Sequence, residues 1–235
     1  MGGPPAPVDA LDPWVALGVI AASTERVRIG TLVTPVPRRR PWKLARETVT
    51  LDHLSNGRLI LGVGLGSPDD AEFSQLGEPA LPQERAVRLD EGLEILARLW
   101  SGETVDYAGQ AYTVRGVRML PRTVQQPRIP IVVAGIWPRR APFRRAARWD
   151  GAVPIDGTRA HCSPETVAAM LKTIRAEHAV GDDFEVMPWK PERDGPLGPS
   201  EARMREYEAA GATWWLDHPA DQDDLERLLV VGRSA

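Results

Sequence analysis

The sequence is poor in cysteine and has no long apolar run. Its one cysteine, Cys162, excludes an internal disulfide and is compatible with a reducing cytoplasm. The longest apolar runs, Val15–Ala22 and Leu59–Gly66, are far shorter than the about 20 residues of a membrane-spanning helix. The first residues, Met-Gly-Gly-Pro-Pro-Ala-Pro, lack the charged and apolar regions of a signal peptide. We therefore expect a cytoplasmic protein with no membrane partner.

Neither sign of charge is in large excess. The chain has 29 Lys and Arg against 32 Asp and Glu, a net charge of −3. No basic stripe predicts a nucleic-acid partner, and no acidic tail predicts a solvating arm. The 43% apolar and 26% charged residues are typical of a globular protein, and 235 residues suffice for one large α/β domain.

Apolar runs typical of buried strands alternate with segments that carry helix start and stop signals. Asp12-Pro13 is an N-cap followed by proline at the first helical position, and Ser55-Asn56-Gly57 is a helix stop. The expected strands are Val27–Val33, Leu59–Gly64, Ile129–Ala134, Ala152–Ile155, Phe184–Met187 and Ala212–Leu216. The expected helices cover 12–25, 41–54, 84–100, 142–149, 163–177, 200–211 and a last segment from Asp221.

This alternation predicts parallel strands joined by crossover helices. It gives six strand–helix units and a hairpin insertion near 103–115, around Ala108-Gly109-Gln110. A closed barrel needs eight units. The count also allows an open six-stranded sheet, so periodicity alone leaves both architectures open.

Several spaced motifs resemble one family. The segment Arg46–Gly64 contains a helix ending in Leu-Asp-x-Leu-Ser-x-Gly-Arg and a strand ending in glycines, a pattern of bacterial-luciferase-like flavin-dependent oxidoreductases. Arg28–Pro35 is similar to the family's third strand, Tyr107–Tyr112 to its hairpin insertion, and Pro130–Gly135 to its fifth strand. Ala146–Gly151 is similar to the helix and turn that follow. The motifs occur in consistent order over nearly the whole chain.

The resemblance implies a (β/α)8 barrel of the TIM type, as a single domain over 1–235, in which the first two strands have no counterpart. It implies an enzyme that uses FMN or the deazaflavin F420 for monooxygenation or hydride transfer on a small organic substrate. A flavin reductase or an F420-reducing system is implied as a partner, and a homodimer as the assembly. The substrate is not readable from these motifs.

The resemblance also places cofactor contacts at the C-terminal ends of the strands. These contacts are Thr34, Gly64, Gly66, Ala134, Gly135, Ile136 and Trp137, with Arg139 and Arg140 at a helix start suited to a phosphate. In F420-using members a non-prolyl cis bond in the third strand supports the ring. His218, after the last expected strand, is the candidate proton carrier. No metal site is expected.

Two departures qualify the resemblance. The luciferase branch carries Cys and Arg at the end of the fourth strand, where Gly64 and Leu65 stand here. The catalytic histidine at the end of that branch's second strand has no counterpart. The missing arginine at Leu65 favours F420 or a general luciferase-like member over luciferase proper.

Simpler interpretations stand beside these predictions. Gly62, Gly64 and Gly66 also fit a tight turn. They do not form a dinucleotide motif, because Ser67 stands where the third glycine belongs, so an NAD-dependent Rossmann dehydrogenase is disfavoured. Arg38–Arg40 fits either an anion-attracting patch or a solvated loop. A non-catalytic flavin-binding remnant or scaffold protein remains an alternative, and Cys162 is expected to be a packing residue.

Overall fold

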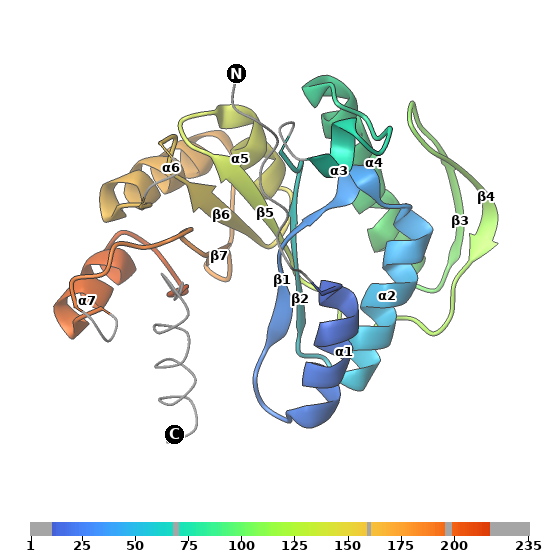
Figure 1. Ribbon diagram of the computed structural model, residues 1–235, viewed down its shortest axis with the longest axis horizontal. Helices are drawn as coiled ribbons and strands as arrows, with labels where there is room; N and C mark the ends of the chain where they lie inside the picture. Colours follow the sequence, from blue (N-terminus) through green and yellow to red (C-terminus); the bar gives the residue numbers. More distant parts are fainter. Residues whose placement is uncertain (1–10, 68–70, 159–160, 196–198, 217–235) are drawn as a thin grey trace. The chain divides into compact units, whose positions relative to one another are not determined.

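The computed structural model describes residues 11–67, 71–158, 161–195 and 199–216 (Figure 1). The chain divides into two compact units, residues 1–130 and 131–235. Each unit combines parallel strands with helices, so the predicted mixed α/β class is confirmed. The prediction of a single domain over 1–235 stays a prediction.

The first unit is built around two parallel strands. Its elements are α1 (Pro13–Ser23), β1 (Ile29–Pro35), the 3₁₀ helix η1 (Val36–Arg38), α2 (Pro41–Leu54), β2 (Leu59–Gly64), α3 (Ala71–Ser74), α4 (Pro82–Trp100), β3 (Thr104–Ala108) and β4 (Thr113–Arg118). Ile29 of β1 pairs with Leu59 of β2, and Pro35 pairs with Gly64. The parallel register therefore brings the C-terminal ends of β1 and β2 together.

The predicted helix signals act as expected in this unit. The Asp12 carboxylate accepts hydrogen bonds from the backbone N–H groups of Trp14 (2.9 Å) and Val15 (3.0 Å) at the start of α1. After α2, Asn56 and Gly57 have φ angles of 51° and 79°, the left-handed conformation that ends a helix. The boundaries of α1 and α2 thus follow from short-range chemistry.

The family-like segment Leu51–Arg58 is held by buried polar contacts. The fully buried Asp52 carboxylate accepts from the backbone N–H groups of Val124 (2.6 Å) and Gln125 (3.2 Å), and from the Gln125 side chain (2.8 Å). Arg58 makes five hydrogen bonds with the turn after α2 and with the end of α1. These two charged residues therefore have structural roles at the N-terminal end of the sheet.

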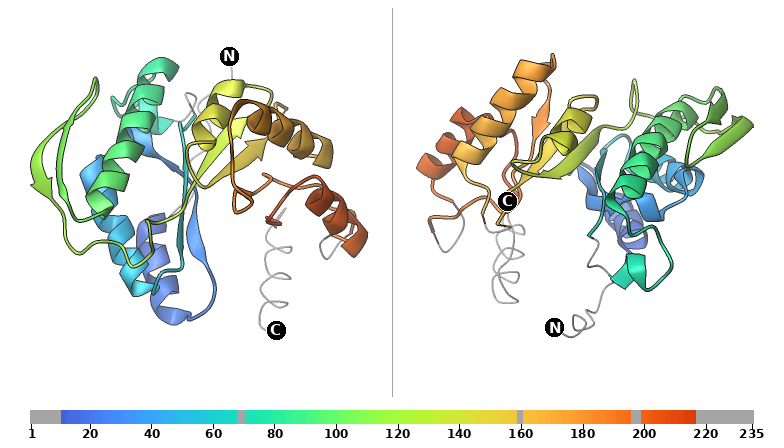
Figure 2. Two further views of the ribbon diagram at one scale, coloured as in Figure 1. Left: turned by 180° about the vertical axis from the view of Figure 1, so that it is seen from behind. Right: turned by 90° about the horizontal axis from the view of Figure 1, so that it is seen from above.

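The predicted hairpin is present as the antiparallel pair β3–β4, and β3 packs against α4 (Figure 2). The Glu91 carboxylate of α4 accepts from three successive backbone N–H groups, those of Gln110, Ala111 and Tyr112. One side chain of α4 thus fixes the tip of the hairpin.

The second unit has the same strand–helix alternation. Its elements are β5 (Ile131–Ile136), α5 (Arg140–Ala146), β6 (Gly151–Ile155), α6 (Pro164–Glu177), β7 (Glu185–Val186) and α7 (Glu201–Ala209). β5 pairs in parallel with β6, and β6 with β7. Ser163 and Ser200 cap α6 and α7 as predicted. No helix among the described residues of either unit is long and apolar enough to cross a membrane.

The expected strand Ala212–Leu216 is wrong, since no strand forms there. The backbone N–H groups of Thr213 and Trp214 both donate to one carbonyl, that of Val186 (3.0 and 3.2 Å). The Val186 N–H in turn donates to the Thr213 hydroxyl (2.8 Å), which replaces the backbone carbonyl of a regular ladder. In place of the sixth expected strand, these hydrogen bonds hold the segment beside Val186 of β7. The helix expected from Asp221 lies outside the described residues.

Candidate functional site

The C-terminal part of β1 carries a pair of hydrogen-bonded hydroxyl groups, those of the buried Thr34 and the partly exposed Thr31. Thr34 is 3% exposed, and its hydroxyl donates to that of Thr31 (2.8 Å), which donates to the carbonyl of Gly62 (3.1 Å). The Leu32–Val33 peptide bond is cis, in the strand where the family resemblance placed a non-prolyl cis bond. The β1–β2 register shifts between Thr31 and Thr34. Polar groups and irregular backbone therefore coincide at this strand end.

The glycines at the end of β2 are explained largely by packing. Gly64 is buried and pairs with Pro35. Gly66 has a φ of 74°, and a Cβ there would collide with the ring of Phe73. A Cβ at Gly62 would collide with the carbonyl of Thr31. The turn interpretation thus accounts for Gly66, and close strand pairing accounts for Gly62, without a ligand.

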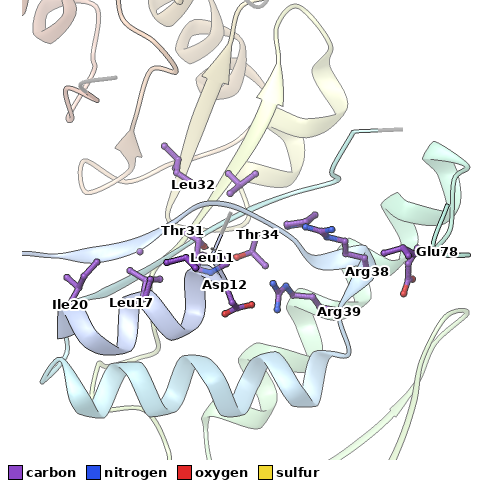
Figure 3. A pocket seen from close by; sticks show the side chains of 16 residues that line it. Leu11, Asp12, Leu17, Ile20, Thr31, Leu32, Thr34, Arg38, Arg39 and Glu78 are labelled. Carbon is purple, nitrogen blue, oxygen red and sulfur yellow. Dashed lines mark hydrogen bonds between the residues drawn. The ribbon is translucent and has the colours of Figure 1, made fainter. Parts of the chain in front are cut away.

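A cavity of about 910 Å³ follows the edge of β1 (Figure 3). It is lined by Leu11, Asp12, Pro13, Ala16, Leu17 and Ile20 around α1, by every residue from Gly30 to Pro35, and by Arg38, Arg39, Leu76 and Glu78. Successive residues of a strand point to opposite faces, so an unbroken run of six lining residues means that the cavity follows the strand's edge. Of the predicted cofactor residues, only Thr34 lines it.

One part of the cavity is basic. Arg38 and Arg39 come from the segment just after β1, opposite Asp12 at the start of α1 (Figure 3). The Nε of Arg39 is buried and has no hydrogen-bond partner among the described residues. Arg40 is exposed and stands before α2. Two of the three successive arginines therefore line the cavity, together with the carboxylates of Asp12 and Glu78, and the Nη1 of Arg39 lies 3.9 Å from a carboxylate oxygen of Glu47.

The predicted phosphate loop lies in the second unit, after β5. A Cβ at Gly135 would collide with Pro142, so this glycine is required by the packing of α5. The N–H of Trp137 donates to Ile155 (2.8 Å), and that of Arg139 to Ile136 (3.0 Å). These two N–H groups are therefore already engaged within the unit.

The two arginines of this loop differ. Arg140 forms an ion pair with Glu177 of α6 (3.2 Å). Arg139 is exposed and has no such carboxylate partner among the described residues. Ala134 and Ile136 are partly exposed near the end of β5, with Trp137 following them. Of the two predicted phosphate ligands, Arg139 is the better placed.

Sequence reasoning missed the contacts of two residues in the first unit. Arg85 of α4 is 2% exposed and donates to the carbonyl of Gly66 (2.9 Å). Phe73 of α3 is fully buried beneath that turn. No feature of the sequence distinguishes a buried arginine in the first turn of an amphipathic helix from a solvated one, and α3, with 4 residues, is too short to show helical periodicity.

The predicted catalytic residue, His218, lies outside the described residues. Cys162 is fully buried, and burial raises the pKa of its thiol to about 12, so it is a packing residue as expected and a poor nucleophile. Within the described ranges, no group of three or more His, Cys, Asp or Glu residues is arranged to hold a metal ion.

Comparison with known proteins identifies the family. Residues 2–188 match the family described as luciferase-like monooxygenase. Over 127 residues the chain is 39% identical to an F420-dependent glucose-6-phosphate dehydrogenase of Microbacterium testaceum, covering 54% of this chain and 36% of that protein.

Solved structures have the same fold. Monooxygenase RslO1 from Streptomyces bottropensis is 30% identical, with a TM-score of 0.61, over 95% of this chain and 63% of its own. A riboflavin lyase solved with modified FMN is 20% identical, with a TM-score of 0.66, over 77% of this chain and 44% of its own. The chain thus spans less than two thirds of each of these proteins. The likeness confirms the predicted luciferase-like fold class.

Proposed function

Because this chain belongs to the luciferase-like monooxygenase family, we propose that it takes part in F420- or FMN-dependent oxidoreduction of a small organic substrate, with F420 preferred. The observation that carries the proposal is the cavity along β1, whose lining residues include Thr34 at the end of the strand and Arg38 and Arg39 just after it. It joins a strand end to a basic patch within one unit.

The described residues fit a planar cofactor with an anionic tail. A volume of about 910 Å³ lies within the range of small-molecule sites, roughly 300–1,000 Å³. The buried Nε of Arg39 lacks a protein partner among the described residues, which suits an anionic ligand. The bound cofactor would supply the redox chemistry. The side chains around Thr34 would orient the ring, and Arg38 and Arg39 would hold the tail.

The remaining contacts belong to the same proposal. Gly64 and Gly66 would let a ring approach the end of β2. Ala134, Gly135, Ile136, Trp137 and Arg139 would form a second set after β5, to which Arg140 contributes less because it is paired with Glu177. His218 is the proposed proton carrier. A flavin reductase or F420-reducing system would complete the cycle.

Two observations support F420 over FMN. Leu65 offers no charge at the position where the luciferase branch places a phosphate-binding arginine. The Microbacterium relative is named for its dependence on F420. An NAD-dependent dehydrogenase has no such support, because the dinucleotide glycine spacing fails at Ser67.

The proposal is tested by titrating the protein with F420, FMN, riboflavin and NAD, followed by fluorescence. We expect F420 to bind most tightly and NAD not to bind. The double variant Arg38→Ala/Arg39→Ala should weaken F420 and FMN binding roughly tenfold or more while leaving riboflavin nearly unchanged. Arg40→Ala, an exposed neighbour, is the matched control and should change none of them.

The outcomes separate the alternatives. Tight NAD binding without flavin or F420 binding would overturn the proposal. Cofactor binding without turnover under any electron donor would support the non-catalytic alternative. Equal weakening of FMN and riboflavin by the double variant would show that the arginines act on the ring or the fold and not on the phosphate.

A further inference from the structure

Arg85 of α4 is a buried cation for which the described part of the chain supplies no acidic partner. It is 2% exposed, and no carboxylate among the described residues pairs with it. Arginine is rarely this buried unless its charge is compensated. Here the carbonyl oxygens of Gly66 (2.9 Å) and Leu65 (3.4 Å) accept from its Nη1, and the guanidinium lies over the ring of Phe73, 5.1 Å from its centroid. These side-chain contacts join Arg85 to the turn after β2 and to α3.

These contacts fix a specific piece of backbone. Gly66 adopts a left-handed conformation directly over the ring of Phe73, which is fully buried. On its other side, a Cβ at Gly66 would lie 3.1 Å from Pro35, which pairs with Gly64. The turn after β2 is therefore fixed between the end of β1 and Phe73, and Arg85 ties down its two carbonyl groups.

The same ring also contacts the cavity. The guanidinium of Arg38, which lines the cavity, lies over Phe73 at 5.8 Å from its centroid. Such contacts are attractive and depend on the position of the ring face. Phe73 thus links the buried Arg85 to a cation of the cavity wall.

We infer that Arg85 is a positioning residue for the cofactor site. It orients the carbonyl groups of Leu65 and Gly66, and through Phe73 it orients Arg38, so that the ends of β1 and β2 present a preformed surface. The inference rests on the proposed function. It assigns Arg85 no contact with the cofactor.

Lysine cannot substitute fully in this role. The planar guanidinium donates in fixed directions and stacks on an aromatic face, whereas an ammonium group is a strongly hydrated point charge that lies poorly over a ring. Arg85→Lys should therefore keep only part of the cofactor affinity that Arg85→Met loses. A role limited to filling space would let methionine behave like the wild type.

The test compares Arg85→Met with Arg58→Met, which removes a structural arginine at the opposite end of the strands. For each variant we would measure the melting temperature, the dissociation constant for F420 and FMN, and amide hydrogen exchange of the peptide 61–67 without cofactor. We expect Arg85→Met to weaken cofactor binding roughly tenfold and to speed exchange at Gly64–Ser67. Arg58→Met should lower the melting temperature at least as much, yet change the dissociation constant less than twofold.

The outcomes distinguish this inference from the proposed function. If wild-type protein binds neither cofactor, the proposed function fails, while the exchange measurement still decides whether Arg85 orders the turn. If the wild type binds and Arg85→Met binds equally well, or if both variants weaken binding in proportion to their loss of stability, the inference is overturned. Partial rescue of affinity by Arg85→Lys supports it.

Discussion

Removing the Arg58 side chain is predicted to destabilise the first unit strongly, because one guanidinium ties three chain segments together. Its Nε donates to the carbonyl of Ser55 (2.7 Å) after α2. Its Nη atoms donate to the carbonyl groups of Ala21 (3.0 Å), Thr24 (2.7 Å) and Val27 (2.6 Å), and to the Thr24 hydroxyl (2.9 Å). Arg58→Met keeps much of the side-chain volume and loses all five bonds.

The expected magnitude follows from the environment of those bonds. Five bonds at about 0.5–1 kcal/mol each set a ceiling of roughly 3–5 kcal/mol. The site is only partly buried, so water can hydrate some of the carbonyl groups after the substitution. We therefore expect a loss of about 3 kcal/mol in the free energy of unfolding, or roughly 6–12 °C in melting temperature.

The assay is urea and thermal unfolding followed by circular dichroism. Arg58→Lys should recover less than half of the loss, since one ammonium group cannot reach acceptors on three segments. A loss below about 1 kcal/mol for Arg58→Met, or full recovery by lysine, would refute the reasoning. A small loss would mean that apolar packing holds the end of α1, and full recovery by lysine would mean that one charged donor suffices without the five bonds.

Three further predictions follow from other described contacts. Asp52→Asn should cost about 2–4 kcal/mol in urea unfolding, because an amide oxygen that accepts from the backbone N–H groups of Val124 and Gln125 leaves the amide NH₂ facing the side-chain NH₂ of Gln125; an unchanged midpoint would contradict this. At pH 8, Cys162 should react with a disulfide reagent roughly a thousandfold more slowly in native than in unfolded protein, because burial raises its pKa from 9.0 to about 12; equal rates would refute this burial. Helix α1 exposes 72% of Val15 and 64% of Val19, a face that the expected homodimer would bury, so Val15→Glu/Val19→Glu should lower the molecular mass measured by light scattering; an unchanged mass would contradict this.

Much of the first unit was predictable because its signals are local. Asp12 and Gly57 act on backbone groups within a few residues, so a short stretch of sequence determines where α1 begins and α2 ends. The strands of the sheet were also predictable, because an unbroken run of apolar residues indicates a strand that is buried on both faces. The cavity was not predictable, because its basic part depends on how η1 turns Arg38 and Arg39 toward α1.

The failures have physical reasons too. Ala212–Leu216 has the composition of a strand, yet the hydroxyl of Thr213 takes the bond that a backbone carbonyl would receive. Arg85 is hidden in an ordinary amphipathic pattern, and its burial depends on a turn about 20 residues earlier. A Cβ at Gly135 would collide with Pro142, a packing requirement that the local sequence pattern does not show, while its predicted cofactor contact stays a prediction. Such contacts between distant residues leave no mark in a local pattern.

Hydrogen–deuterium exchange with and without F420 tests directly whether the cofactor binds at the C-terminal ends of β1 and β2. We expect protection of backbone amides in residues 30–39 and 62–67, with no change in β3 and β4. Protection confined to the hairpin, or binding of F420 without protection of residues 30–39, would contradict it.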